Sequence, residues 1–275
     1  MFLVKTTEGD SRSIWLLGNV GLEPEPVTFE SGLRCLHQKS LSLRQRATET
    51  PEPFSDEDVA AMSVVPPFGG TKILCVGRNY KPHAEELGNP IPIEPLWFSK
   101  PPSSLVPSGG TVVIPEEVGR IDYEGELALV VGRRCRRLRE AEALSCLAGV
   151  TAALDVTARE LQKKDGQWTR AKGFDTFCPL GPVLLPFTEA WLDARLTTTV
   201  NDRLVQDDRT SSLIFSVPQL LAHLTACMTL EPGDVILTGT PAGVGPIHPG
   251  DRVSVKIEGP QTLTLSVSVE SAPRT

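Results

Sequence analysis

The stretch Ile121-Asp122-Tyr123-Glu124-Gly125-Glu126-Leu127-Ala128-Leu129-Val130-Val131-Gly132 decides how this chain is interpreted. Its second half is a continuous apolar run, which is typical of a buried strand. Its first half carries acids. Because residues i and i+2 of a strand face the same side, Glu124 and Glu126 are expected side by side. Two close carboxylates repel each other unless one is protonated or a cation lies between them. From this stretch alone, a cation site and a solvated polar strand end are equally good interpretations.

Composition limits the classes of protein that fit. The 275 residues are 40% hydrophobic and 22% charged, which suits one or two globular domains. The formal net charge of −7 argues against a nucleic-acid partner, since phosphate contacts need a basic face, but it allows a small anionic substrate beside a local cation or metal. No signal-peptide pattern and no apolar run of ~20 residues is present. We therefore expect a cytoplasmic protein with no membrane partner and reduced cysteines.

Two domains are predicted. Residues 1–68 form a small α+β N-terminal domain, with a hairpin from the apolar segments 2–4 and 14–17 and a helix over 32–46. Prolines at positions 51, 53, 66 and 67 precede the boundary. In residues 69–275, short strands outnumber helices and no regular βαβ alternation occurs. The predicted fold class is therefore mostly β with some α.

A polar segment follows the short apolar strand predicted at residues 72–77. Pro82 suits the first turn of a helix and Gly88 suits its end, so His83 and Glu86 become i,i+3 neighbours on one face. A carboxylate beside an imidazole raises its basicity, as a general base requires. On spacing alone, an exposed short helix with a casual ion pair is the commoner arrangement.

Asp155 lies within the apolar strand predicted at residues 150–156, where an acid is costly unless it is paired or bound to a metal. With Glu124 and Glu126 it makes an all-oxygen ligand set, which favours Mg²⁺ or Mn²⁺ over zinc. Lys172 completes an inventory that matches metal-assisted chemistry on a carbonyl compound. The glycine-rich loop 239–245 lacks both nucleotide-binding fingerprints, and we expect it to be a backbone-lined turn that binds a carboxylate.

Six ordered blocks of this sequence resemble the fumarylacetoacetate hydrolase family, in the branch of bacterial acylpyruvases and 2-hydroxyhepta-2,4-diene-1,7-dioate isomerases. The blocks begin at Val76-Gly77-Arg78-Asn79-Tyr80, Asp122-Tyr123-Glu124, Asp155-Val156-Thr157-Ala158-Arg159, Lys172, Thr210-Ser211-Ser212 and Leu237-Thr238-Gly239-Thr240-Pro241. The resemblance covers about residues 70–270 and implies a mixed β-sandwich roll that is usually a homodimer. It also implies a divalent metal at the positions of Glu124, Glu126 and Asp155.

The resemblance further implies roles for individual residues. Lys172 matches the family's active-site lysine, although Gly173 follows it where serine is often expected. The segment that carries His83 and Glu86 matches a lid that orders when substrate binds. The positions that match substrate-side residues are Arg78, Gln162 and Thr240.

The function predicted from these features is metal-dependent hydrolysis of a C–C bond in a 2-oxo or enol acid of the acylpyruvate or dicarboxylic type. In this hypothesis Glu86 orients His83, which deprotonates a water, and Lys172 stabilises the oxyanion or supplies a proton. The alternatives are an oxaloacetate-type decarboxylase and a 2-hydroxyhepta-2,4-diene-1,7-dioate isomerase or decarboxylase of aromatic catabolism. A catalytically idle binding homologue is the remote alternative.

Overall fold

The computed structural model describes residues 2–8, 12–18, 25–45, 64–65, 68–86, 88 and 90–273. The four prolines that marked the predicted boundary lie outside these residues. Within the described ranges, no helix is long and apolar enough to cross a membrane.

In the described part of the chain, eleven strands form one mixed sheet. Its main path runs β3-β2-β1-β13-β11-β10-β16-β5-β6, while β4 pairs with β1 and β7 pairs with β13. The strands are β1 (Phe2–Glu8), β2 (Arg12–Gly18), β3 (Glu25–Val27), β4 (Val64–Val65), β5 (Ile73–Gly77), β6 (Leu96–Lys100), β7 (Leu105–Pro107), β10 (Gly125–Val131), β11 (Leu147–Leu154), β13 (Cys178–Pro186) and β16 (Val235–Leu237).

Two smaller sheets complete the β structure, one of five strands in the order β15-β14-β18-β19-β8 and one of three in the order β12-β9-β17. The five strands are β8 (Thr111–Ile114), β14 (Arg195–Val200), β15 (Arg203–Arg209), β18 (Arg252–Glu258) and β19 (Thr262–Ser271). The three are β9 (Ile121–Tyr123), β12 (Thr157–Ala158) and β17 (Gly245–Pro246). The predicted fold class, mostly β with some α in a mixed β-sandwich roll, is confirmed.

Strand β10 lies at the centre and is buried on both faces. Leu127 and Leu129 on one face belong to the same apolar cluster as Val253 of β18, so this face packs toward the five-stranded sheet. Ala128 on the other face shares a second cluster with Leu36 of helix α1 (Phe29–Gln45). This double burial is the reason the sequence shows a continuous apolar run instead of an alternating one.

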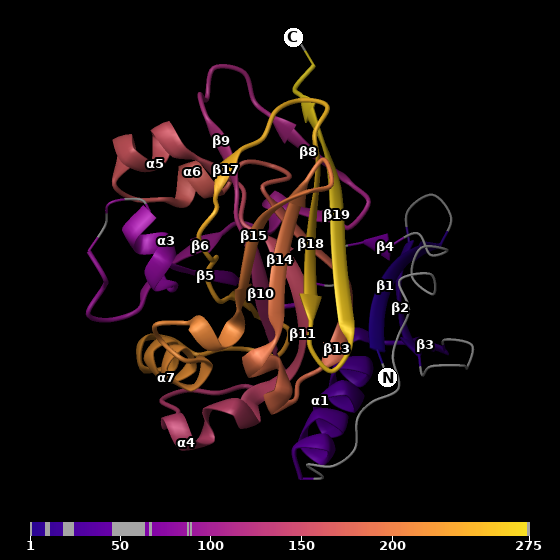
Figure 1. The fold of residues 1–275 in the computed structure, drawn as a ribbon. Coiled ribbons are helices and arrows are strands. Elements are labelled where there is room, and N and C mark those ends of the chain that lie inside the picture. Colours follow the sequence, from indigo (N-terminus) through magenta and orange to yellow (C-terminus); the bar gives the residue numbers. More distant parts are fainter. Residues whose placement is uncertain are drawn as a thin grey trace.

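The helices lie around the sheets and mostly on one side of them (Figure 1). Besides α1 they are α3 (Lys81–Glu86), α4 (Glu140–Ala143), α5 (Arg159–Asp165), α6 (Thr169–Lys172) and α7 (Val217–Cys227). Short 3₁₀ turns occur at η1 (Pro102–Ser104), η2 (Leu144–Cys146), η3 (Glu189–Asp193) and η4 (Thr210–Ser212).

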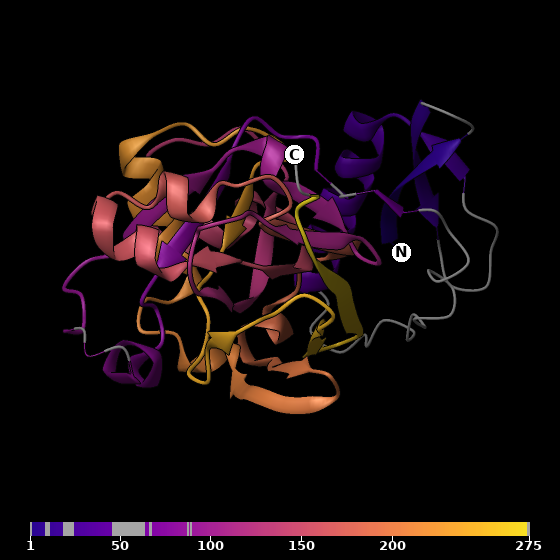
Figure 2. The same cartoon turned by 90° about the horizontal axis from the view of Figure 1, so that it is seen from above.

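The N-terminal segment contains the predicted hairpin, with β1 and β2 antiparallel from Phe2↔Gly18 to Glu8↔Arg12. The predicted helix at 32–46 is α1, which begins three residues earlier, at Phe29. Strand β1 pairs with β13 at Leu3↔Leu184, so the N-terminal strands extend one end of the large sheet. Figure 2 shows them beside the rest of the molecule. The division into two domains at residue 68 stays a prediction.

Candidate metal centre and active site

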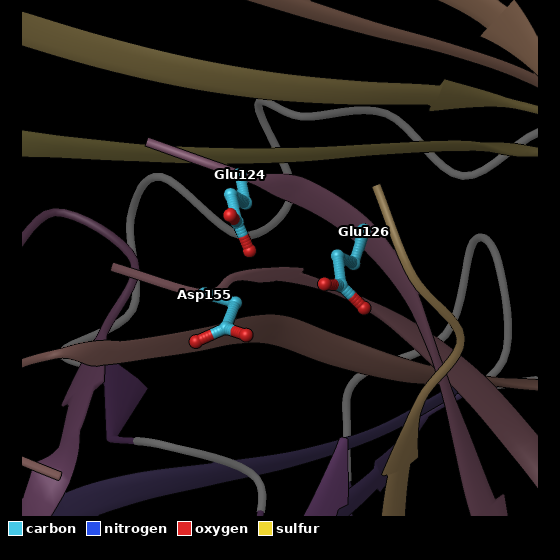
Figure 3. Close-up of side chains that lie close together, drawn as sticks. All are labelled: Glu124, Glu126 and Asp155. Atoms are coloured by element: carbon cyan, nitrogen blue, oxygen red, sulfur yellow. The ribbon is translucent and has the colours of Figure 1, made fainter. Parts of the chain in front are cut away.

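Glu124 and Glu126 are buried where β9 gives way to β10, with exposed fractions of 4% and 1%. Asp155 directly follows the last residue of β11, and its backbone N–H donates to the Glu124 carbonyl at 2.8 Å. Figure 3 shows the three carboxyl groups converging from the two neighbouring strands, and one oxygen of each lies within 4.8 Å of the others. The interpretation as a solvated strand end is therefore wrong. Asp155 lies directly after the end of its strand, and not within the strand as the sequence predicted.

Gly125, between the two glutamates, is required by close packing from the five-stranded sheet. A Cβ at this position would lie 2.2 Å from Thr198 Oγ1. Gln206 accepts a hydrogen bond from the Gly125 N–H at 3.0 Å and donates to Thr240 Oγ1 at 2.8 Å, while Thr240 donates to the Gly125 carbonyl at 2.9 Å. These contacts fix the backbone from which both glutamates project.

Buried cations pair with two of the three acids. Lys172 Nζ donates to Glu124 Oε2 and to Asp155 Oδ2, both at 2.7 Å. Lys100 Nζ donates to Asp155 Oδ1 at 2.5 Å, and Arg159 Nη2 lies 2.6 Å from Glu124 Oε1. Burial lowers the pKa of Lys172, but Asp155 and Glu124 outweigh this and raise it, so the side chain is an ammonium.

The two glutamates respond to these surroundings in opposite ways. Burial alone raises the pKa of Glu124, but Lys172 first and then Arg159 and His83 reverse the direction, so the pKa of Glu124 lies well below its usual range. Burial also raises the pKa of Glu126, and here Asp155 and Glu124 add to the increase. The Gly239 N–H donates to Glu126 Oε2 at 2.6 Å. A bound cation would relieve the repulsion that Glu126 meets from Asp155 and Glu124.

Arg159 is held in place by Asp122, which is fully buried. Arg159 Nε donates to Asp122 Oδ2 at 2.7 Å, and Arg120 donates to both Asp122 oxygens at 2.6 and 3.0 Å. Arg159 Nη1 also donates to Gln162 at 3.0 Å. Asp122 therefore orients the Arg159 guanidinium toward both Glu124 and Gln162, which is one of the predicted substrate-side residues.

Helix α3 carries the predicted His83–Glu86 pair, and both residues lie on one turn as expected. His83 Nδ1 is 3.7 Å from Glu86 Oε2, which is ion-pair range and too long for a hydrogen bond. Burial lowers the pKa of His83, with Glu124 opposing this and Arg159 adding to it, so the imidazole is neutral at pH 7. The Glu86 carboxylate instead accepts the Gly243 N–H at 3.1 Å. The loop 239–245 thus binds carboxylates of its own chain, Glu86 and Glu126.

A cavity of about 760 Å³ opens above these groups. The predicted site residues that line it are Arg78, His83, Glu124, Glu126, Gln162, Lys172 and Thr240. Asp155 lies behind Lys172, and Glu86 points toward Gly243, so neither lines the cavity. One wall is aromatic: Phe98 and Trp168 meet edge to face at 5.4 Å, and the Arg78 guanidinium lies 5.6 Å from the Trp168 ring centroid.

Lys100 and Arg159 are site residues that the sequence analysis did not single out. Lys100 ends a strand directly before two prolines, a position where a lysine is usually solvated, and Arg159 lies inside a matched block without a role of its own. The sequence around such a residue does not show that its charge is buried, because the burial depends on a partner that is distant along the chain.

The donor set fits a hard divalent ion. Three carboxylates offer oxygen atoms, which Mg²⁺ and Mn²⁺ prefer, and the nearby cysteines Cys75 and Cys178 are fully buried thiols whose pKa is raised by burial first of all. Burial first, and then Asp155 and Glu124, raise the pKa of Glu126, and an added positive charge would relieve the repulsion among these carboxylates.

Comparison with known proteins places the family domain in the part of the chain that carries the six matched sequence blocks. The model of the fumarylacetoacetate hydrolase C-terminal family matches residues 72–268. The mitochondrial oxaloacetate tautomerase FAHD1 of Arabidopsis thaliana is 44% identical over 215 residues, which is 74% of this chain and 94% of that protein.

Two solved structures resemble the whole chain. A 2-hydroxyhepta-2,4-diene-1,7-dioate isomerase from Mycobacterium marinum is 35% identical with a TM-score of 0.79, and a 5-carboxymethyl-2-hydroxymuconate delta-isomerase from Mycobacterium smegmatis is 34% identical with a TM-score of 0.78; each match covers 100% of both chains. This chain belongs to the fumarylacetoacetate hydrolase family.

Proposed function

We propose that the protein is a divalent-metal-dependent isomerase that transfers a proton between carbon and oxygen in a small 2-oxo or enol dicarboxylic acid. The observation that carries this proposal is the buried set of three carboxylates joined to Lys172 at one cavity. The relatives support the isomerase alternative over the predicted hydrolase, because they are named as a tautomerase and as isomerases.

The proposed ligands of Mg²⁺ or Mn²⁺ are Glu124, Glu126 and Asp155. When bound, such an ion would act as a Lewis acid that stabilises negative charge on a carbonyl or enol oxygen. The all-oxygen donor set and the crowding of Glu126 support this assignment.

Two groups of the chain can move the proton. His83 is buried, neutral and lines the cavity, so one of its ring nitrogens can accept a proton from the substrate carbon beside the carbonyl. Lys172 Nζ, an ammonium held by Glu124 and Asp155, can donate a hydrogen bond to the oxygen on which negative charge develops. The protonated imidazole can then give this proton to that oxygen, which completes the transfer without an attacking water.

The remaining walls suit an anionic substrate. Arg78, Gln162 and Thr240 place one guanidinium, one amide and one hydroxyl around the same space. The rings of Phe98 and Trp168 belong to the same cavity wall, and apolar surroundings strengthen a polar contact such as one between Arg78 or Gln162 and a bound carboxylate. We also propose a homodimer, as the family resemblance implies.

Hydrolysis of an acylpyruvate is the second candidate, and the 3.7 Å approach of His83 to Glu86 favours it. A small shift of either side chain would bring this pair into hydrogen-bond range, and the imidazole could then activate a water. Decarboxylation of an oxaloacetate-like acid would use the same metal site without that water.

The test is a substrate panel with Mg²⁺, Mn²⁺ or EDTA. The interconversion of keto and enol oxaloacetate is followed by the ultraviolet absorbance of the enol, while nuclear magnetic resonance detects cleavage of acylpyruvates and fumarylpyruvate and loss of carbon dioxide. We expect metal-dependent tautomerisation to be the fastest reaction. Faster cleavage of an acylpyruvate would overturn the isomerase proposal in favour of the hydrolase.

A further inference from the structure

Cys135 and Cys146 are two cysteines that the proposed chemistry does not use. Strands β10 and β11 are paired up to Val131↔Leu147, and Cys146 comes directly before the last of these residues. The Gly132 N–H donates to the Cys146 carbonyl at 2.7 Å, so the two chain segments stay side by side beyond the paired strands. Cys135 follows shortly after in the first of these segments.

The thiol of Cys135 is held beside that of Cys146. The backbone N–H and C=O of Cys135 each form a hydrogen bond of 3.0 Å with Leu230, which anchors this residue. The Cys146 S–H donates a hydrogen bond to the Cys135 sulfur, and both side chains belong to the same buried cluster. Two thiols in contact on separately anchored segments can be joined with little movement of the backbone.

The two thiols differ in reactivity. The hydrogen bond from Cys146 first, and Arg133 in the same direction, lower the pKa of Cys135 against the increase caused by burial. The same hydrogen bond first, and then burial, raise the pKa of Cys146. Cys135 is 5% exposed, whereas Cys146 is fully buried. Because the thiolate is the nucleophile, Cys135 is the sulfur that reacts first with a small oxidant.

The pair lies at the opposite end of β10 from the proposed metal centre. Glu126 is the second residue of β10, whereas the cysteines lie beyond the other end of the paired strands. In Figure 1, helix α4, which lies between the cysteines in the sequence, is at the lower end of the molecule. Helix α6, which carries Lys172, is at the upper end. Oxidation of this pair therefore changes no proposed metal ligand.

We propose that Cys135 and Cys146 are a peroxide-reactive dithiol, a modification site at which an intramolecular disulfide ties the chain after β10 to the chain before β11. The Cys135 sulfur attacks one oxygen of hydrogen peroxide, the O–O bond breaks, and the products are a sulfenic acid at Cys135 and water. The Cys146 sulfur then attacks the sulfenic sulfur, loses its proton and releases a second water as the disulfide forms. Two thiols lose two electrons, and one peroxide is reduced to two waters.

A second pair of buried cysteines gives an internal comparison. Cys75 and Cys178 are both fully buried, and burial first of all raises the pKa of each thiol. Neither sulfur is therefore an accessible thiolate. We expect peroxide to oxidise Cys135 and Cys146 about tenfold faster than Cys75 and Cys178.

The test uses the full-length reduced protein and hydrogen peroxide. After timed exposure, the remaining thiols are alkylated in denaturant and the chain is cleaved after glutamate, which places Cys135 in peptide 127–140 and Cys146 in peptide 143–160. Mass spectrometry then detects the linked peptides, which are lighter than the two reduced peptides together by two hydrogen atoms. We expect this link to be the first disulfide formed and dithiothreitol to reverse it.

This measurement needs no variant to decide the proposal. If the link between peptides 127–140 and 143–160 does not form, or forms no faster than Cys75 and Cys178 are oxidised, the proposal is overturned.

Variants then assign the two roles. Cys146→Ser removes the second thiol, so peroxide should leave Cys135 as a sulfenic acid that dimedone labels. Cys135→Ser should abolish the disulfide and give about tenfold less labelling at Cys146, which keeps its proton. Cys227→Ser, which removes an exposed cysteine, is the matched control and should form the link at the unaltered rate. Equal labelling in the first two variants would contradict the assignment of Cys135 as the attacking thiol.

Discussion

Two regions of the molecule hold similar chemical groups in different ways. One is the carboxylate floor, which comprises Glu124 and Glu126 in the cavity lining, Asp155 behind Lys172, and the cations that pair with these acids; the other is the short helix α3. In the floor, ion pairs of 2.5 to 2.7 Å join buried side chains, and the three acids lie at the ends of strands β10 and β11, which are buried along their whole length. On α3, His83 and Glu86 are 3.7 Å apart, and the Glu86 side chain is 36% exposed. The floor is therefore preorganised for charge, whereas the α3 pair would have to move to act as a unit.

The largest effect should come from the floor itself. Glu126→Gln removes the ligand whose repulsion a metal relieves, so we expect loss of Mn²⁺ binding and about a thousandfold lower tautomerase turnover. Calorimetric titration with Mn²⁺ and the enol absorbance assay measure the two quantities. Glu116→Gln, on an exposed loop, should change neither. Metal-dependent turnover that persists in Glu126→Gln would contradict the assignment of the floor.

The second effect concerns the stability of the floor. Asp122→Asn removes one of the two carboxylates that pair with the buried guanidinium of Arg159, the other being Glu124, and breaking a buried ion pair in this way costs about 3 kcal/mol. Urea unfolding measures the loss in free energy of unfolding. Asp207→Asn is the matched control, because both side chains of its pair with Arg195 are exposed, 41% and 47%, so its loss should change the free energy of unfolding much less. Equal losses would mean that the buried network does not stabilise the fold.

The third effect tests the imidazole. His83→Ala removes the proposed proton acceptor, so tautomerisation should slow about a hundredfold. Mn²⁺ affinity should stay within about threefold, since His83 is not one of the proposed ligands. The absorbance assay and the Mn²⁺ titration together separate a lost base from a lost metal. Tautomerisation at the normal rate would remove His83 from the mechanism.

The smallest effect is expected at Glu86. Because its carboxylate is held by the Gly243 N–H and not by His83, Glu86→Gln should change the tautomerisation rate less than about threefold. The hydrolase hypothesis predicts the opposite, a loss as large as that of His83→Ala, since Glu86 would then orient the imidazole. Comparing the two variants in the tautomerase and acylpyruvate assays shows which arrangement operates.

Much of the floor could be predicted from the sequence, because the side-chain period of a strand is 2. That rule alone places Glu124 and Glu126 on one face, and an acid at the end of the following antiparallel strand, Asp155, lies beside them. The fold class followed from many short strands without βαβ alternation. The family blocks supplied Lys172, which forms ion pairs with Glu124 and Asp155 in the floor.

The charge balance of the floor could not be predicted in this way. Lys100 is 55 residues from Asp155, and its burial depends on β6 pairing with β5, a contact that no local pattern encodes. The hydrogen bond from Gly243 to Glu86 likewise joins positions 157 residues apart. The spacing of His83 and Glu86 therefore could not show that the Gly243 N–H competes with the imidazole for the Glu86 carboxylate. Spacing along the chain shows which groups can meet, but tertiary contacts decide which partner each one takes.

The aromatic wall of the cavity also gives the protein a built-in optical reporter. Trp97 and Trp168 line the cavity, and Trp168 has the Arg78 guanidinium above its ring. An anion that draws Arg78 away from the indole changes the field around the chromophore, and with it the intensity and wavelength of emission. Binding of a colourless acid can therefore be followed from the protein's own fluorescence, before any turnover is measured.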